Sequence, residues 1–371
     1  MKIDQKLYKP MGMIAAGFIV LILFIALIAA CSRPKKVDAD NMYQLEARLI
    51  EVAQRYYSTR ESSLPKEGNK ITLSVASLVE EGYIRPLESL IVRGDECTAT
   101  ITVMNNNGFY LYLPKINCGS RYSPKNLSEE ITQDANLVTT GNGLYLRPNG
   151  YIFRGEDLNN HLEFAGKLWH ILRVNTDGSL RIMEIPRRDS IVWDDRFNIE
   201  RNHNLGINDY MTMNINSRIK DSIEAIYEDE DEFNDNERAH FIPQDLCIGK
   251  RSEEDTGFDG SIECSNKLDN QILSIIATYE FMQASLDPEC ITILDNSCEN
   301  YNYLAFLTPT FWTITANADT TDRIFKISRR ASSSIASTSA SLKIVAHLTS
   351  EVLFSSGDGS IENPFRLISS K

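Results

Sequence analysis

Cysteine is the residue type in this sequence best suited to do chemistry, and the chain has seven of them. Six lie far from the N-terminus in three couples that are close in sequence: Cys97 with Cys118, Cys247 with Cys264, and Cys290 with Cys298. None is a C-x-x-C, and no histidine lies near enough to complete a zinc-type spacing. Paired cysteines of this kind are typical of disulfides, which persist in oxidising compartments. We therefore expect three disulfides, no metal, and a location outside the cytoplasm.

A second group of candidate residues, Trp193, Asp194 and Asp195, combines an aromatic ring with two carboxylates. A tryptophan can offer its face to a sugar or peptide, although core packing is the more frequent role of this residue. The carboxylates are oxygen ligands of the kind that calcium prefers, but the ordered spacing of a calcium-binding loop is missing. We treat the three residues as a weak candidate for ligand binding.

Patterns typical of enzymes are missing from the sequence. The five histidines are scattered without an i, i+4 pair, and no G-x-S-x-G, Walker-type loop or G-x-G-x-x-G follows a predicted strand. No catalytic residue and no cofactor is therefore predicted. The net charge of −13 and the lack of a basic cluster after Lys36 also argue against nucleic acid as a partner.

The positions of these residues depend first on an apolar run, residues 13–30, which lacks any charge. Eighteen residues are just long enough to span a hydrocarbon core, so residues 1–37 are expected to form a signal or transmembrane anchor. The run ends at Cys31, and Ile28-Ala29-Ala30-Cys31 resembles a bacterial lipobox. Cys31 is thus either acylated or the end of a membrane helix. The remainder is expected to face outward from the cell membrane.

Residues 38–125 read as a small α+β domain. Apolar residues at helical spacing predict a helix from about Asp40 to Tyr57, and Ser74 and Gly82 are plausible ends of a short second helix. Asn107-Gly108 predicts a two-residue hairpin turn, in which residue i faces residue 215 − i. Cys97 would then face Cys118 in a non-hydrogen-bonded pair, with Cα atoms roughly 4.5 Å apart.

A membrane helix continuing into an amphipathic helix, then LVEEGYI, then a hairpin with a cysteine near each end, resembles the type IV pilin and pseudopilin subunits. The resemblance implies a pilin-like fold for residues 38–125. Pilins carry a cleavage motif with a glutamate at its fifth position, whereas residues 17–21 read GFIVL. This difference argues against assembly into a filament.

A polar linker is expected at residues 126–140, followed by a larger α+β domain at 141–371. Its beginning is rich in strands, with a hairpin turn at Asp177-Gly178. Residues 207–227 suggest a helix pair or one broken helix, and residues 268–285 suggest a single amphipathic helix. The acidic run at 228–237 and the low-complexity segment that begins at Arg329 are expected to be surface loops.

The pieces YIFRGEDLNNHLEFAGKLWHILRV, GINDY, CIGKR and NYLAFLTPTFWTIT resemble a C-terminal domain of uncharacterised function in membrane-anchored proteins of Gram-positive bacteria, and their order is similar to the C-type-lectin-like fold. This resemblance implies a membrane-anchored binding or adhesion protein that presents its second domain to a surface glycan, peptide or protein. A minor pilin-like subunit of a surface assembly and an enzyme acting on envelope polymers are the alternatives.

Overall fold

The computed structural model describes residues 36–368. Almost all of the expected anchor at 1–37, including the candidate lipidation site Cys31, lies outside these residues. Within residues 36–368, no helix is both long and apolar enough to cross a membrane. The described chain mixes α-helices with several β-sheets, which confirms the α+β class predicted from the sequence.

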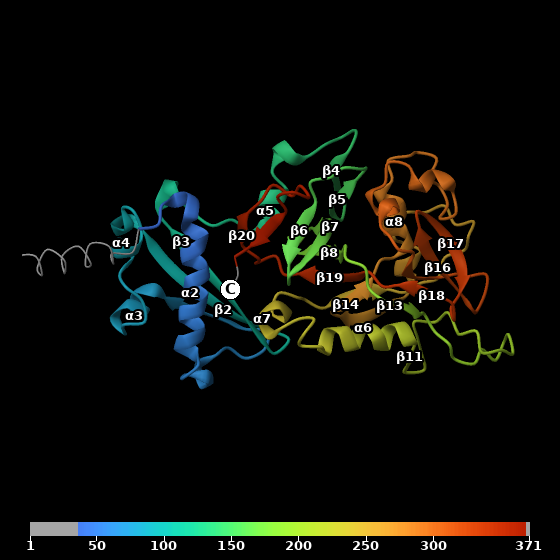
Figure 1. Ribbon diagram of the computed structural model, residues 1–371, viewed down its shortest axis with the longest axis horizontal. Helices are drawn as coiled ribbons and strands as arrows, with labels where there is room; N and C mark the ends of the chain where they lie inside the picture. Colours follow the sequence, from blue (N-terminus) through green and yellow to red (C-terminus); the bar gives the residue numbers. More distant parts are fainter. Residues whose placement is uncertain (1–35, 369–371) are drawn as a thin grey trace, which may run out of the picture.

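The chain forms two lobes that lie one after the other along the long axis of the molecule (Figure 1). In the first lobe, residues 36–122, a helix packs on a three-stranded antiparallel sheet of order β1-β2-β3. Its elements are α2 (Met42–Tyr57), α3 (Val75–Glu80), α4 (Leu87–Leu90), β1 (Lys70–Ser74), β2 (Thr98–Asn106) and β3 (Phe109–Asn117). The helix forms because Leu45, Leu49 and Ala53 recur at helical spacing and are buried against the sheet.

The hairpin predicted in the first lobe is confirmed residue by residue. The register pairs Asn106 with Phe109 and Thr98 with Asn117, so every pair adds up to 215. Pro114 sits inside the ladder without ending it, opposite Ile101. The second helix begins as predicted, because the Ser74 side chain accepts a hydrogen bond from the backbone N–H of Ala76 (3.2 Å).

The second lobe, residues 127–368, has two larger sheets. The nine-stranded sheet has the order β14-β19-β8-β7-β6-β21-β20, with β5 paired to β7 and β4 to β5, and the five-stranded sheet has the order β17-β16-β15-β18-β9. The strands of the first are β4 (Gly143–Arg147), β5 (Gly150–Arg154), β6 (His161–Phe164), β7 (Lys167–Asn175), β8 (Leu180–Glu184), β14 (Leu273–Ile275), β19 (Ile344–Leu348), β20 (Phe354–Ser356) and β21 (Phe365–Leu367). Those of the second are β9 (Ser190–Val192), β15 (Phe311–Ala316), β16 (Arg323–Ser328), β17 (Arg330–Ile335) and β18 (Ser339–Ser341).

Two two-stranded sheets, four α-helices and several short 3₁₀ helices complete the described part of the second lobe. The sheets and α-helices are β10 (Met211–Thr212) with β11 (Ile215–Asn216), β12 (Gln244–Cys247) with β13 (Lys267–Gln271), α5 (Leu127–Ile131), α6 (Arg218–Glu228), α7 (Asp235–Arg238) and α8 (Thr278–Ala284). Helix α5 falls inside the segment expected to be a linker, and its Leu127 and Ile131 belong to the large core of this lobe.

Several expectations for the second lobe are wrong. Residues 268–285 form β13, β14 and only then the short helix α8, and residues 207–227 form the β10–β11 hairpin followed by α6. In both segments the apolar residues fit a helical period. In the first, a sheet partner elsewhere in the chain decides the outcome, because Leu273 and Ile275 pair with β19. In the second, β10 and β11 pair with each other, and only the part from Arg218 is helical.

Both expected surface loops also contain ordered structure. The segment after Arg329 forms the strands β17 and β18. The acidic run is fixed in its middle, because Phe233 is fully buried and the Glu232 carboxylate accepts hydrogen bonds from Lys167 (2.6 Å) and Arg188 (2.8 Å). Hydrogen bonding to Arg188 lowers the pKa of Glu232 to about 2.

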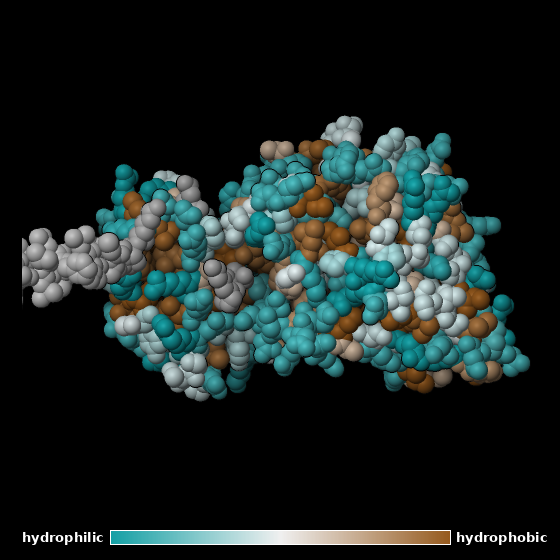
Figure 2. Space-filling model, viewed as in Figure 1, coloured by the Kyte–Doolittle hydropathy of each residue, from teal (hydrophilic) through white to brown (hydrophobic). Residues whose placement is uncertain are grey.

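The two lobes are joined by direct contacts as well as by the chain. The side-chain amides of Asn106 and Asn107, at the tip of the β2–β3 hairpin, donate hydrogen bonds to the carbonyls of Ala239 (2.9 Å) and Phe241 (3.4 Å). Ala239, Leu353 and Ile368 of the second lobe pack into the core of the first. Figure 2 shows a waist between the lobes and a mostly hydrophilic face with scattered hydrophobic residues.

Candidate functional site

The structure separates the three residues that the sequence singled out for ligand contact. Trp193 is fully buried, and its ring N–H donates a hydrogen bond to the carbonyl of Thr313 (3.2 Å). Asp194 is also buried, and its carboxylate accepts a hydrogen bond from Arg196 (2.6 Å). Asp195 is exposed and holds the guanidinium of Arg218 at 2.7 Å.

Asp194 and Asp195 lie with Arg196 and Arg218 along an open depression of about 510 Å³ that does not include Trp193. Each of the two carboxylates already has an arginine partner, so neither is free to bind calcium without losing an ion pair. Within residues 36–368, no group of three histidine, cysteine or acidic side chains is placed to hold a metal ion. Ligand binding at this depression stays a prediction.

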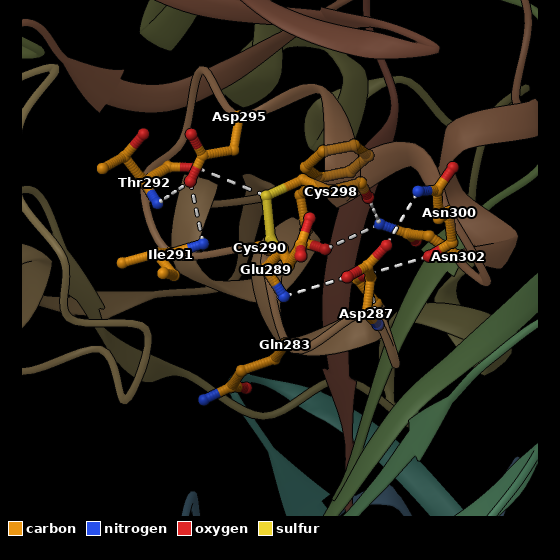
Figure 3. The surroundings of a disulfide bond; sticks show 12 residues. Gln283, Asp287, Glu289, Cys290, Ile291, Thr292, Asp295, Cys298, Asn300 and Asn302 are labelled. Carbon is orange, nitrogen blue, oxygen red and sulfur yellow. Dashed lines mark hydrogen bonds between the residues drawn. A yellow bond between two sulfur atoms is a disulfide. The ribbon is translucent and has the colours of Figure 1, made fainter.

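The three predicted disulfides are confirmed. Their Cα atoms lie 4.2 Å apart in Cys97–Cys118, 4.3 Å in Cys247–Cys264 and 4.6 Å in Cys290–Cys298. Figure 3 shows the third disulfide, where the Asp295 carboxylate accepts hydrogen bonds from the backbone N–H groups of Ile291 (2.9 Å) and Thr292 (2.6 Å). These bonds order a loop that has few core residues of its own.

A different site, which the sequence did not indicate, lies over the nine-stranded sheet. A cleft of about 530 Å³ opens there, and we call it the cationic cleft after the basic side chains that line it. Its size is in the range of small-molecule sites in proteins. Its main lining residues are Arg173, Arg181, His347, Tyr279, Gln244, Asp245 and Lys267.

The floor of the cationic cleft is a row of three side chains on adjacent strands. Arg173 on β7 is the register partner of Arg181 on β8, and Arg181 is in turn the partner of His347 on β19. Directly opposed residues of neighbouring strands project from the same face of the sheet. Two arginines in that relation repel each other, so the row costs stability unless an anion offsets the charge.

Helix α8 supplies such an anion to only one of the two arginines. The Glu280 carboxylate accepts two hydrogen bonds from Arg181, at 2.5 and 2.8 Å, in a buried bidentate pair. Burial, together with the charges of Arg181 and Arg173, holds the pKa of His347 well below its usual value. His347 is therefore neutral at pH 7 and adds no charge.

Arg173 has no hydrogen-bonded carboxylate of its own, although its pKa is raised, because the lowering effect of burial is outweighed by Tyr279 and by the charge of Glu280. Its Nε is buried and makes no hydrogen bond, and its Nη1 lies 3.5 Å from the hydroxyl of Tyr279. No carboxylate among residues 36–368 lies within ion-pair distance of it, since the ion pairs of the cleft end at Arg181. Leaving a buried donor unpaired costs about 1–3 kcal/mol, and more for a charged group. This side chain is the part of the cleft that an incoming anion would complete.

The wall of the cationic cleft is the β12–β13 hairpin, which the Cys247–Cys264 disulfide closes at one end. Its residues Gln244, Asp245 and Lys267 line the cleft, and none of their side chains hydrogen-bonds to another described residue. The site therefore combines a fixed positive floor with a polar wall that is free to accept hydroxyl or amide groups. It offers binding chemistry, and the carboxylates of Asp177 and Asp245 also line it.

Sequence reasoning missed the cleft because its members come from five separate strands and a helix. The one local signal is Arg173 itself, a charged residue between Leu172 and Val174, both of which are buried. No protein-family model, curated protein or solved structure matches this chain. The likeness to pilins and to the C-type-lectin-like fold accordingly stays a prediction.

Proposed function

We propose that this chain is a membrane-anchored, outward-facing binding protein whose second lobe holds an anionic ligand in the cationic cleft. The observation that carries the proposal is Arg173, which lies beside a second arginine, has a buried Nε without a hydrogen bond, and forms no ion pair among the described residues. A ligand carboxylate or phosphate on Arg173 would repeat what Glu280 does for Arg181.

The compartment is supported by the three disulfides, because such bonds are rare where thiols are kept reduced. In this view the anchor lies in residues 1–37, the first lobe is a stalk with a pilin-like fold, and the second lobe, with a lectin-like fold, presents the cleft. The ligand would be a surface glycan, peptide or protein that carries negative charge.

Calorimetric titration of the full-length chain in detergent tests this proposal. A tetramer of galacturonic acid and inorganic phosphate serve as anionic probes, and a neutral galactose tetramer serves as the matched control ligand. Binding of at least one anionic probe, weakened by added salt, is expected. The Arg173→Gln variant should weaken it about ten- to hundred-fold, the equivalent of about 1.5–3 kcal/mol for a hydrogen bond to a charged group.

Arg48→Gln is the matched control variant, because Arg48 is exposed on α2 in the other lobe. It should bind like the parent. Binding that is indifferent to Arg173→Gln, or no binding of either anionic probe, would refute a role of the cleft in ligand recognition.

A further inference from the structure

Strand β17 ends the five-stranded sheet and has a neighbour on one side only. It pairs with β16 from Arg330 to Ile335, and no backbone hydrogen bond joins residues 331–334 to any other described strand. One backbone group of this segment is already engaged, because the Ser333 carbonyl accepts a hydrogen bond from the Arg323 side chain (3.2 Å). A strand edge of this kind exposes a row of N–H and C=O groups that can pair with another extended chain.

The β17 edge lacks the protection that several other sheet edges of this protein have. Residues 331–334 read ASSS, with neither a charge nor a proline. The edge strands β14, β20 and β9 are only three residues long, and β3 carries Pro114 and Lys115. Short strands, lysine and proline are the usual means by which edges avoid pairing with other chains. Two other edge strands, β1 and β4, are five residues long without a proline, and β17 belongs with them to the longer edges of the described chain.

Two arginines stand at the start of this edge. The side chains of Arg329 and Arg330 are 68% and 51% exposed, and both contact the carboxylate of Glu299, at 3.0 and 2.6 Å. One carboxylate cannot neutralise two guanidinium groups, so this corner keeps a net positive charge. The third disulfide restrains this corner, because Glu299 directly follows Cys298 in the chain.

We infer that the β17 edge binds an extended peptide segment by strand addition, with an acidic residue of that segment on Arg329 and Arg330. Backbone pairing along residues 331–334 would supply affinity, and the two arginines would select for the carboxylate. The small serine and alanine side chains would place little restriction on the peptide's other residues. This inference does not depend on the cationic cleft.

The position and charge of the edge favour this occupant. Figure 1 places β16, β17 and β18 at the end of the molecule opposite the point where the described chain begins. A second copy of the chain, pairing antiparallel through the same edge about Ser332 and Ser333, would bring Arg330 opposite Ile335 of the partner. That arrangement would add no second carboxylate beside Glu299, whereas an acidic peptide supplies one.

The test titrates the full-length chain in detergent with an eight-residue peptide of alternating threonine and valine that carries a glutamate at each end. A twin peptide with the same side chains and N-methylated alternate amides cannot form the strand ladder. We expect the parent peptide to bind and the twin to bind at least ten-fold more weakly. Arg330→Gln should weaken the parent peptide about five-fold or more, whereas Arg48→Gln should leave its affinity unchanged.

Thermal unfolding of Arg330→Gln checks that the exposed substitution leaves the fold intact. Equal binding of the peptide and its N-methylated twin would overturn the inference, as would no binding of either. Concentration-dependent dimerisation in sedimentation velocity that Ser332→Lys abolishes, without peptide binding, would show that a second copy occupies the edge and would also overturn it.

Discussion

Glu46 lies in the middle of α2 with no exposed surface, where it faces the core of the first lobe. Its carboxylate accepts hydrogen bonds from the hydroxyl of Tyr122 (2.6 Å) and from the backbone N–H of Ile116 (3.3 Å). Both bonds favour the charged form, but burial outweighs them and raises the pKa of Glu46 from 4.5 to about 7. The folded state therefore retains a proton that the unfolded chain gives up at a lower pH.

This difference makes the stability of the first lobe depend on pH. For an acid whose pKa is higher in the folded state, the free energy of unfolding is greatest below the unfolded value and falls as pH rises towards the folded value. The window is thus from about pH 4.5 to about pH 7. Each pKa unit corresponds to about 1.4 kcal/mol, so the loss across the window is about 3 kcal/mol.

Glu46→Gln tests the argument, because glutamine keeps the size and an acceptor oxygen but does not titrate. The variant and the parent should be similarly stable at pH 4.5, and the variant should be more stable by up to about 3 kcal/mol at pH 8. Hydrogen exchange of backbone amides in α2 and β3, followed by mass spectrometry, reports on this lobe separately from the other. Exchange free energies need correction for the intrinsic pH dependence of exchange.

Glu51→Gln is the matched control, because Glu51 is exposed on the same helix. It should show the same pH dependence as the parent. Parallel curves for the parent and Glu46→Gln between pH 4.5 and pH 8 would refute the reasoning, since they would mean that Glu46 has the same pKa in both states.

Two further predictions concern the second lobe. Replacing both Cys247 and Cys264 by serine removes a disulfide between residues 17 positions apart. In the chain-entropy model this should lower the free energy of unfolding by about 3 kcal/mol, measured as a lower midpoint of thermal unfolding. An unchanged midpoint would contradict the prediction. Glu263→Gln leaves the fully buried Arg251 without its counter-charge and should cost about 3–5 kcal/mol in urea unfolding, whereas Glu51→Gln should cost almost nothing.

The parts of the fold that could be predicted are those that short stretches of chain determine by themselves. Asn107-Gly108 specifies its own turn, the turn specifies the register, and the register brings Cys97 opposite Cys118. The segment around Leu273 could not be predicted in the same way. Its apolar residues suit a buried strand or a helix equally well. The segment forms a strand because it pairs with β19, some seventy residues later in the chain.

The candidate site was hidden for the same reason. Arg173 and Arg181 face each other across the hairpin that turns at Asp177-Gly178, but His347 comes more than 160 residues later in the chain, and only the strand order β7-β8-β19 brings it beside them. The residues that did attract attention behave differently: Trp193 packs in the core, as large aromatic residues usually do, and Asp194 serves its neighbour Arg196. The residue types suggested a binding role there, but Trp193 is fully buried and so its ring has no surface to offer a ligand.

The disulfides also determine how the protein would respond to a pulling force applied between residues 36 and 368. Residues enclosed by a disulfide cannot contribute to lengthening, because tension passes through the sulfur atoms and bypasses the loop. The cysteines of the first lobe are 21 positions apart, so at roughly 3.5 Å per residue that loop withholds about 70 Å of extension. The hairpin that contacts the second lobe is therefore, like the loops of the other two disulfides, a segment that stretching cannot extend until its disulfide is reduced.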